Sequence, residues 1–174
     1  SLDEIENEVE RLAVATSHPQ WLVERWVESY GFEKTREMLE ENNIPPVQTV
    51  RVNVTKATVE QVLTTLEREG VKAKRSEFVP ECIYLLSGQA ARTAAFRNGL
   101  ITIQDESSML PATVLNPLPG MKVLDMCAAP GGKTTHMAEK MNNEGSILAT
   151  DLHPKKLDLI EENTERLGLS IVQT

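Results

Sequence analysis

The chain has 174 residues, 40% of them hydrophobic, and a formal net charge of −8. This size suits one or two globular domains. No apolar run approaches the roughly 18 residues of a membrane-spanning helix, and the acidic start at residues 1–4 lacks the basic and apolar regions of a signal peptide. Two cysteines, Cys82 and Cys127, are too few for a disulfide framework or a zinc site. We therefore expect a cytoplasmic protein with reduced thiols, no membrane association and no metal.

The acidic average disfavours a nucleic-acid binder, because phosphate contacts come from Lys and Arg. The charge is unevenly distributed, however. Residues 1–45 are strongly acidic, whereas residues 68–97 are locally basic. The basic residues of that segment are Arg68, Lys72, Lys74, Arg75, Arg92 and Arg97. A local nucleic-acid-binding face and an ordinary solvated surface both fit this pattern.

Residues 1–45 are predicted to form a helical connector. Apolar residues at helical spacing over 2–15 indicate a first helix. A second helix should begin with Pro19 as its first residue and end at Gly31, and a third should follow before Asn42 and Asn43. Trp21 and Trp26 share the apolar face of the second helix, which favours core packing over stacking on bases.

Residues 46–104 predict an α/β subdomain. Valines 50, 52 and 54 alternate with polar residues, which indicates a half-buried strand. A capping box at Thr58 opens a helix that ends at Gly70. Strands over 71–75, 82–86 and 100–104 and a helix over 89–96 complete the split β-α-β order of ferredoxin-like and RNA-recognition domains. Tyr84 is the only aromatic residue in these strands, so RNA contact and a purely structural role are both open.

Residues 105–174 predict the N-terminal half of a Rossmann-like, doubly wound sheet. A helix capped around Asp105 runs to Leu115. Strands over 122–126, 146–150 and 170–174 then alternate with helices over 134–141 and from His153 to Gly168. The chain as a whole is therefore expected to be α/β.

A glycine loop lies between the first of these strands and the helix that follows it. This is the place where ligands bind in open α/β sheets. Gly131 and Gly132 let the backbone approach a ligand and reach positive φ, and the helix start presents free N–H groups to an anionic part of the ligand. Asp151 ends the next strand, where an acid is placed to accept hydrogen bonds from ribose hydroxyls.

Three ligands compete for this loop. Gly132-Lys133-Thr134 resembles the end of a nucleotide-triphosphate loop, but that pattern needs a glycine where Cys127 stands. The dinucleotide fingerprint of three spaced glycines is also missing. S-adenosylmethionine would use the same ribose-binding acid but has no phosphates. A glycine turn without any ligand remains the simplest alternative.

The run from Asp125 to Thr134, Asp-Met-Cys-Ala-Ala-Pro-Gly-Gly-Lys-Thr, resembles motif I of the RsmB/NOL/NOP/Sun family of RNA 5-methylcytosine methyltransferases. The segment Gln104–Ser108 is similar to the family's QDxSS segment, and Arg51-Val52-Asn53 to its RVN signature. The stretch from Ser17 to Leu22 resembles the sequence that precedes the RNA-binding subdomain. Within the family, the resemblance is strongest to the bacterial members that act on small-subunit ribosomal RNA.

The resemblance implies an S-adenosylmethionine-dependent transferase of class I methyltransferase fold that takes part in rRNA processing. It implies a donor site formed by Cys127, Ala128, Ala129, Pro130, Gly131, Gly132, Lys133 and Asp151. In the family, one cysteine attacks carbon 6 of cytosine, which activates carbon 5 for methylation, and a second cysteine helps to release the product. Both are expected in motifs beyond Thr174, so no catalytic residue is assigned.

The chain is accordingly expected to be an inactive fragment of an enzyme whose partner is RNA. Its truncated sheet is expected to self-associate. Cys127 should pack within the donor loop, and Cys82 should be a core residue. His18, His136 and His153 should have capping or surface roles. The alternative functions are an RNA-binding module without catalysis and, less well supported, a P-loop-like NTPase.

Overall fold

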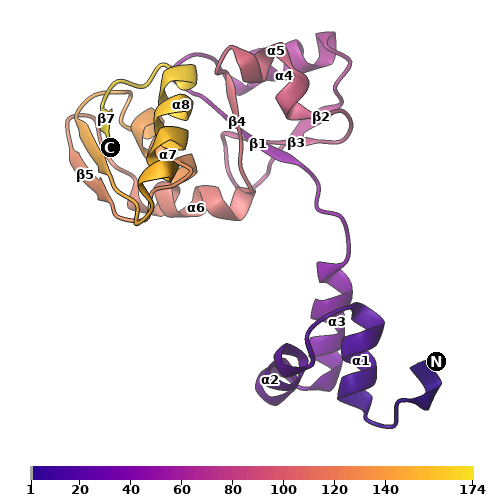
Figure 1. Cartoon of the computed structure of the whole chain (residues 1–174). Helices are drawn as coiled ribbons and strands as arrows, with labels where there is room; N and C mark the ends of the chain where they lie inside the picture. Colours follow the sequence, from indigo (N-terminus) through magenta and orange to yellow (C-terminus); the bar gives the residue numbers. More distant parts are fainter. Residues whose placement is uncertain (1) are drawn as a thin grey trace. The chain divides into compact units, whose positions relative to one another are not determined.

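The computed structural model describes residues 2–174, which form two units (Figure 1). The first unit ends at Pro46, and the second runs from Val47 to Thr174. Among the described residues, no helix has the length and apolar character needed to cross a membrane.

The first unit is a small helical body whose core contains Leu12, Val23 and Leu39. Its elements are a 3-10 turn η1 (Leu2–Glu4) and three helices, α1 (Glu8–Thr16), α2 (Gln20–Tyr30) and α3 (Phe32–Asn42). The first helix starts later than predicted, because the Asn7 side chain caps it by accepting from two backbone N–H groups. Pro19 is the N-cap of α2 rather than its first residue. The shared core position predicted for the tryptophans is wrong for Trp21, which is 64% exposed, whereas Trp26 packs on the core.

The second unit begins with a four-stranded antiparallel sheet of order β2-β3-β1-β4, which confirms the split β-α-β prediction. Its elements are β1 (Thr49–Val52), α4 (Val59–Arg68), β2 (Ala73–Arg75), β3 (Cys82–Leu85), η2 (Ala90–Arg92), α5 (Ala94–Arg97) and β4 (Ile101–Ile103). The helix predicted over 89–96 is divided in two. Thr93 interrupts it in an extended conformation and caps α5 by accepting from the Phe96 N–H.

Both faces of the antiparallel sheet are covered. Val50, Val52 and Ile83 point into a core shared with α4 and α5. On the opposite face, Tyr84 donates a hydrogen bond to Glu106, and Cys82 packs with Met109. The half-buried strand predicted around Val50 is therefore wrong, since every residue of β1 is buried.

A three-stranded parallel sheet of order β5-β6-β7 follows, which confirms the predicted half of a doubly wound fold. Its elements are α6 (Glu106–Leu115), β5 (Lys122–Asp125), α7 (Gly132–Lys140), β6 (Ser146–Ala149), η3 (Pro154–Lys156), α8 (Leu157–Leu167) and β7 (Val172–Gln173). Residues of α6, α7 and α8 pack with Ile147 on one side of this sheet. Helices α6 and α7 thus lie between the two sheets of the unit (Figure 1).

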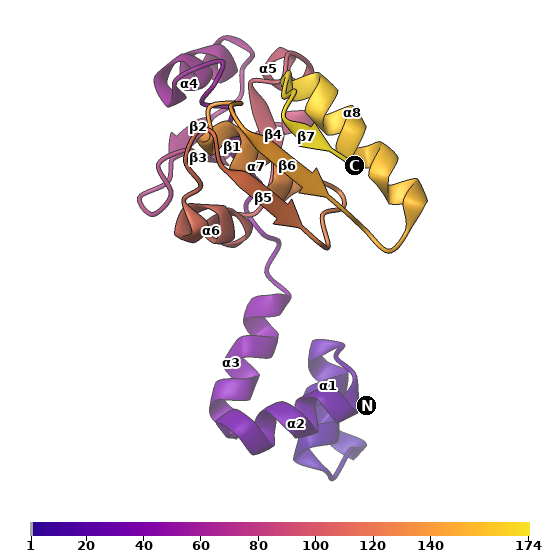
Figure 2. The ribbon, with the colours of Figure 1, turned by 90° about the vertical axis from the view of Figure 1, so that its left-hand side faces the viewer.

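The other side of the parallel sheet carries exposed leucines. Leu124 of β5 is 56% exposed and Leu148 of β6 is 46% exposed. Figure 2 looks onto this uncovered face, with β5 and β6 in front of α7. The predicted boundary at residue 104 does not separate compact units, because the two sheets share their helix layer. The division into residues 46–104 and 105–174 therefore stays a prediction.

We expect the chain to self-associate through the uncovered face, because adjacent exposed leucines on a sheet favour burial against a second copy. Sedimentation velocity over a range of concentrations should show reversible association. A double substitution of Leu124 and Leu148 to Lys should shift the protein toward monomer. The matched control is Phe78→Lys, which places one charge at an apolar side chain that is 82% exposed elsewhere. Unchanged association in the double variant would contradict the expectation.

Candidate functional site

The glycine loop runs from the end of β5 at Asp125 to the start of α7 at Gly132. Its backbone is attached to the end of the neighbouring strand, since the Ala128 N–H donates to the Thr150 carbonyl at 3.0 Å. Because β5 and β6 are parallel, their carboxyl ends meet at one edge of the sheet. The structure thereby brings residues 127–133 and Asp151, which are distant in sequence, to one place.

Gly131 needs to be glycine for two reasons. Its φ is +94°, and a Cβ at this position would lie 3.3 Å from the Cα of Ile160 on α8. The left-handed backbone and the close approach of α8 both disfavour a side chain. Gly131 is also the N-cap of α7 and has no side chain to bond the first N–H groups of that helix. These donors are therefore available to a ligand at the positive end of the helix.

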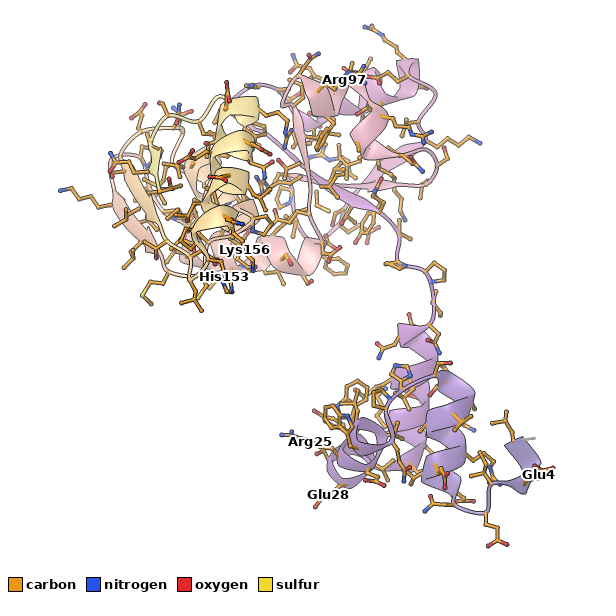
Figure 3. The ribbon with its side chains drawn as sticks, in the orientation of Figure 1. Glu4, Arg25, Glu28, Arg97, His153 and Lys156 are labelled. Carbon is orange, nitrogen blue, oxygen red and sulfur yellow. The ribbon has the colours of Figure 1, made fainter. Side chains whose placement is uncertain are left out.

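Asp151 turns its carboxylate toward the loop. Its Oδ2 accepts from the Ala129 N–H and its Oδ1 from the His153 N–H, each at 3.2 Å. The His153 N–H, followed by the Ala129 N–H, lowers the pKa of Asp151, so the carboxylate is ionised near neutral pH. Each oxygen keeps a further lone pair for a ligand hydroxyl. His153 and Lys156 lie beside this turn, where the chain enters α8 (Figure 3).

The predicted site residues differ in exposure. Cys127, Pro130 and Lys133 are exposed, whereas Ala128 and Gly131 are buried. The prediction that Cys127 packs within the loop is therefore wrong: its side chain faces solvent. The buried residues shape the loop, and the exposed ones line its outer surface.

Three further side chains hold the loop, and none of them was assigned to the site from the sequence. Asp125 accepts a hydrogen bond from the Thr134 hydroxyl at 2.7 Å, which ties the end of β5 to the first turn of α7. Asn163 of α8 donates to the Pro130 carbonyl at 3.1 Å. Asp125 and Thr134 are the two ends of the motif-like run, and that was the available signal for them. Asn163 carried no signal.

The least expected contact comes from the antiparallel sheet. Arg51 of β1 is fully buried and forms an ion pair with Glu139 of α7, at 2.8 Å from its Nε to the Glu139 Oε2. Its Nη1 donates to the Gly132 carbonyl at 2.8 Å, and its Nη2 donates to the Thr135 hydroxyl at 2.9 Å. Burial raises the pKa of Glu139, and the charge of Arg51 opposes that effect. A residue 81 positions away thus bonds the loop backbone directly.

A second buried pair involves His136, which lies one turn before Glu139 on α7. His136 is 1% exposed and its Nε2 lies 2.7 Å from the Glu81 Oε1, so the surface or capping role predicted for it is wrong. The hydrogen bond to His136, assisted by Lys140, lowers the pKa of Glu81 to about 2. Burial lowers the pKa of His136. This pair binds α7 to the segment before β3.

The two cysteines lie in different environments. Cys82 is fully buried, as predicted, and burial raises the pKa of its thiol to about 12. Cys127 is a free, exposed thiol in the glycine loop. Within residues 2–174, no group of three or more His, Cys, Asp or Glu side chains is arranged to hold a metal ion.

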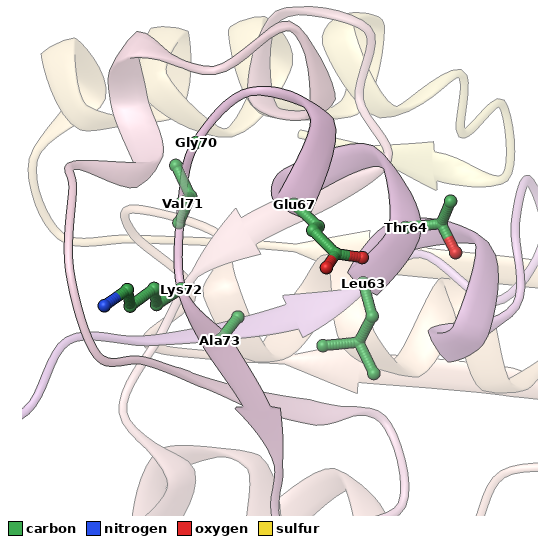
Figure 4. A pocket seen from close by; sticks show the side chains of 7 residues that line it. All are labelled: Leu63, Thr64, Glu67, Gly70, Val71, Lys72 and Ala73. Carbon is green, nitrogen blue, oxygen red and sulfur yellow. The ribbon is translucent and has the colours of Figure 1, made fainter.

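One hollow in the described part of the chain lies away from the glycine loop. It has a volume of about 560 Å³ and lies between α4 and β2. Figure 4 shows Leu63, Val71 and Ala73 around it, with the Glu67 carboxylate between them and Lys72 pointing away. These side chains lack a convergent set of polar groups, so the chemistry points to the loop rather than to this hollow.

Comparison with known proteins adds family information. Residues 18–92 match a family model described as the ferredoxin-like domain of RsmF/B-like methyltransferases, and residues 112–174 match one described as 16S rRNA methyltransferase RsmB/F. The chain is 47% identical over 172 residues to the probable ribosomal RNA small subunit methyltransferase B of Bacillus subtilis, covering 99% of this chain and 38% of that protein. It is 36% identical to ribosomal RNA small subunit methyltransferase B of Pseudomonas syringae, covering 90% of this chain and 35% of that protein.

A solved structure of a methyltransferase homologue from Pyrococcus horikoshii matches with a TM-score of 0.86 and 32% identity. The match covers 97% of this chain and 56% of that one. The chain thus spans well under half the length of these two curated relatives.

The pair of Glu81 and His136 should make stability depend on pH. Both pKa values are lowered by folding, so the unfolded chain binds more protons and the free energy of unfolding decreases as the pH falls. The contribution of His136 is lost as pH falls below about 6.5, the ordinary value for histidine. That of Glu81 is lost from about 4.5 down to about 2.

Urea unfolding across this range tests the expectation. Glu81→Gln should cost about 1–3 kcal/mol at pH 7, because it replaces a charged acceptor of the His136 hydrogen bond. It should also reduce the loss of stability between pH 5 and pH 3. Glu77→Gln, at an exposed neighbouring position, is the control. Parallel pH curves for wild type and Glu81→Gln would contradict the assignment.

Proposed function

The chain belongs to the RsmB/F family of ribosomal RNA methyltransferases, and from this membership we propose that it carries the methyl-donor site of an enzyme forming 5-methylcytosine in small-subunit ribosomal RNA. One observation carries the proposal: Asp151 and the N-terminus of α7 converge on the glycine loop. The relatives named above are small-subunit rRNA methyltransferases by name. An rRNA substrate implies that the protein acts in the cytoplasm.

S-adenosylmethionine fits the chemistry of this loop. Residues 127–133 would hold its methionine and ribose parts, and the Asp151 carboxylate would accept hydrogen bonds from the ribose hydroxyls. The loop does not need to accommodate phosphates, which agrees with Cys127 standing where a phosphate-binding loop has glycine. When bound, the donor supplies an electrophilic methyl group. The residues of this chain orient that group and do not react with it.

We assign no residue of this chain as the nucleophile that attacks cytosine. A cysteine that attacks cytosine must ionise readily, and the buried Cys82 has a thiol pKa of about 12. Cys127 belongs to the donor loop, and we do not assign it as the nucleophile. We therefore propose that this chain provides donor binding and that other parts of the longer enzyme provide the attacking and releasing cysteines.

The three segments of the chain receive separate roles in this proposal. Residues 1–45 form a connector, residues 46–104 form an RNA-contacting subdomain, and residues 105–174 form the first part of the donor domain. RNA-recognition domains stack bases on the open face of their sheet. Here α6 and α7 cover that face, so RNA would have to contact other surfaces of the subdomain.

A second function, RNA binding without catalysis, is favoured by the exposed basic residues of the subdomain. Lys72, Lys74 and Arg75 lie on or beside the edge strand β2, and all three are exposed. Lys74 lies over the ring of Tyr84 at 5.6 Å from its centroid. Such an edge can follow a phosphate backbone without reading its bases.

Donor binding is tested by calorimetry with S-adenosylmethionine. Wild type should bind it in preference to ATP with magnesium. Asp151→Asn should weaken binding by about tenfold or more, because a hydrogen bond to a charged group contributes about 1.5–3 kcal/mol. Asp158→Asn, an exposed acid in the first turn of α8, should bind like wild type.

The same titrations separate the alternatives. Tight binding of ATP with magnesium and no binding of S-adenosylmethionine would favour the NTPase function and refute the proposal. Equal donor affinity in Asp151→Asn and wild type would remove Asp151 from the site.

RNA binding is tested by fluorescence titration with small-subunit rRNA fragments over a range of salt concentrations. Affinity should fall as salt rises, with each phosphate contact to single-stranded RNA adding about 0.7 to the logarithmic slope. A double substitution of Lys72 and Lys74 to Glu should weaken binding and reduce that slope. Lys122→Glu, at an exposed position of β5, is the control. No binding even at low salt would exclude an RNA-binding role for this chain.

A further inference from the structure

We propose that Arg51 is a positioning residue for the methyl-donor site: from the antiparallel sheet, its guanidinium holds the glycine loop in the shape that binds the donor. The inference rests on the proposed function, because it concerns how that same site is kept in order. It assigns a role in donor binding to a side chain of the subdomain otherwise assigned to RNA.

Arg51 uses every N–H donor that a guanidinium has. Nε donates to Glu139. Nη1 donates to Gln104 and to the Gly132 carbonyl, and Nη2 donates to the Thr135 hydroxyl and to Glu139. A lysine ammonium has only three donors and cannot reproduce this planar fork. This buried site therefore requires the five donors of arginine, and a positive charge alone would not be sufficient.

Two of these bonds lead to the carbonyls of the loop glycines. One reaches the Gly132 carbonyl directly at 2.8 Å. The other passes through Thr135, whose hydroxyl accepts from Arg51 and donates to the Gly131 carbonyl at 2.8 Å. The ion pair with Glu139 alone would neutralise the buried charge. The bonds to the glycine segment go beyond that requirement and fix the backbone that faces the ligand.

The loop is thus held from two sides. The parallel sheet and α8 hold residues 128–130 through Thr150, Asp151 and Asn163. Arg51 holds residues 131 and 132 from the antiparallel sheet. A loop with two adjacent glycines has many accessible conformations. Restricting it before the ligand arrives lowers the entropy that binding must overcome.

The test separates donor positioning from simple stability. Arg51→Met and Glu139→Leu each leave one partner of a buried ion pair alone and should destabilise the chain. The double substitution removes both charges and should restore a cooperative fold. It should still bind S-adenosylmethionine about tenfold more weakly than wild type, because the Gly132 carbonyl loses its donor and the Thr135 hydroxyl that bonds Gly131 loses the guanidinium that holds it. Amide hydrogen exchange at residues 128–133 should become faster in the double variant.

The matched control is Asn53→Ala. Asn53 is buried just after the end of β1 and donates to the Gly99 and Leu167 carbonyls at 3.1 Å, so it joins the antiparallel subdomain to the end of α8 without touching the loop. This variant should lose stability but keep donor affinity within about twofold of wild type. If it loses as much affinity as the double variant, the effect belongs to the whole interface and the proposal fails.

A single variant covers the case in which the double variant does not fold. Thr135→Val removes the hydroxyl that relays Arg51 to Gly131 and leaves the Arg51–Glu139 ion pair in place. It should weaken donor binding by about threefold and speed exchange at Gly131 and Gly132. Wild-type affinity in a folded double variant, or in Thr135→Val, would overturn the role of Arg51. Absence of donor binding by the wild-type chain would instead overturn the proposed function, and this inference with it.

Discussion

The ion pair between Arg51 and Glu139 is the interaction on which the second unit depends. Both side chains are almost completely removed from water, with exposed fractions of 0% and 1%. Burying two charges is costly unless their attraction and further hydrogen bonds compensate for the lost hydration. Here the compensation is complete on the arginine side, since all five N–H groups have acceptors. A pair of this kind is a poor source of stability but a strong constraint on geometry, because almost no other arrangement satisfies it.

The shared layer of α6 and α7 explains why this constraint exists. Both helices pack against the parallel sheet, and both also close the second face of the antiparallel sheet. Apolar contacts such as Met109 with Cys82 supply part of this interface. Polar contacts supply the rest: Glu106 accepts from Tyr84, and Glu81 pairs with His136. Hydrogen bonds restrict the relative orientation of two packed elements more narrowly than apolar contacts do. These polar contacts therefore hold the two sheets in one relative orientation.

In this architecture, helices cover the inner face of the antiparallel sheet. Its inner face carries Arg51, Cys82 and Tyr84, which all point to α6 or α7 rather than to solvent. Helices α4 and α5 cover its other face, and β2 forms one of its edges. In the proposed enzyme, the subdomain would therefore both contact RNA at its outer surface and hold the donor loop through its inner surface.

Local patterns in the sequence were sufficient for the order of the elements. The alternation around Val50, the capping box at Thr58 and the glycine loop between two apolar runs depend on neighbours within a few residues, and such patterns can be read along the chain. The glycine loop and Asp151 could be placed together because parallel strands end at one edge.

The roles of Arg51, Glu139 and His136 could not be predicted. A polar residue that alternates with valines is ordinarily exposed to solvent. Arg51 is buried only because its strand packs against a helix more than 80 positions away in the sequence. The sequence by itself determined the fold class and the place of the candidate donor site. Only the tertiary structure decided which charges are buried and which sheet holds that site, because burial depends on what covers a face and not on the pattern along it.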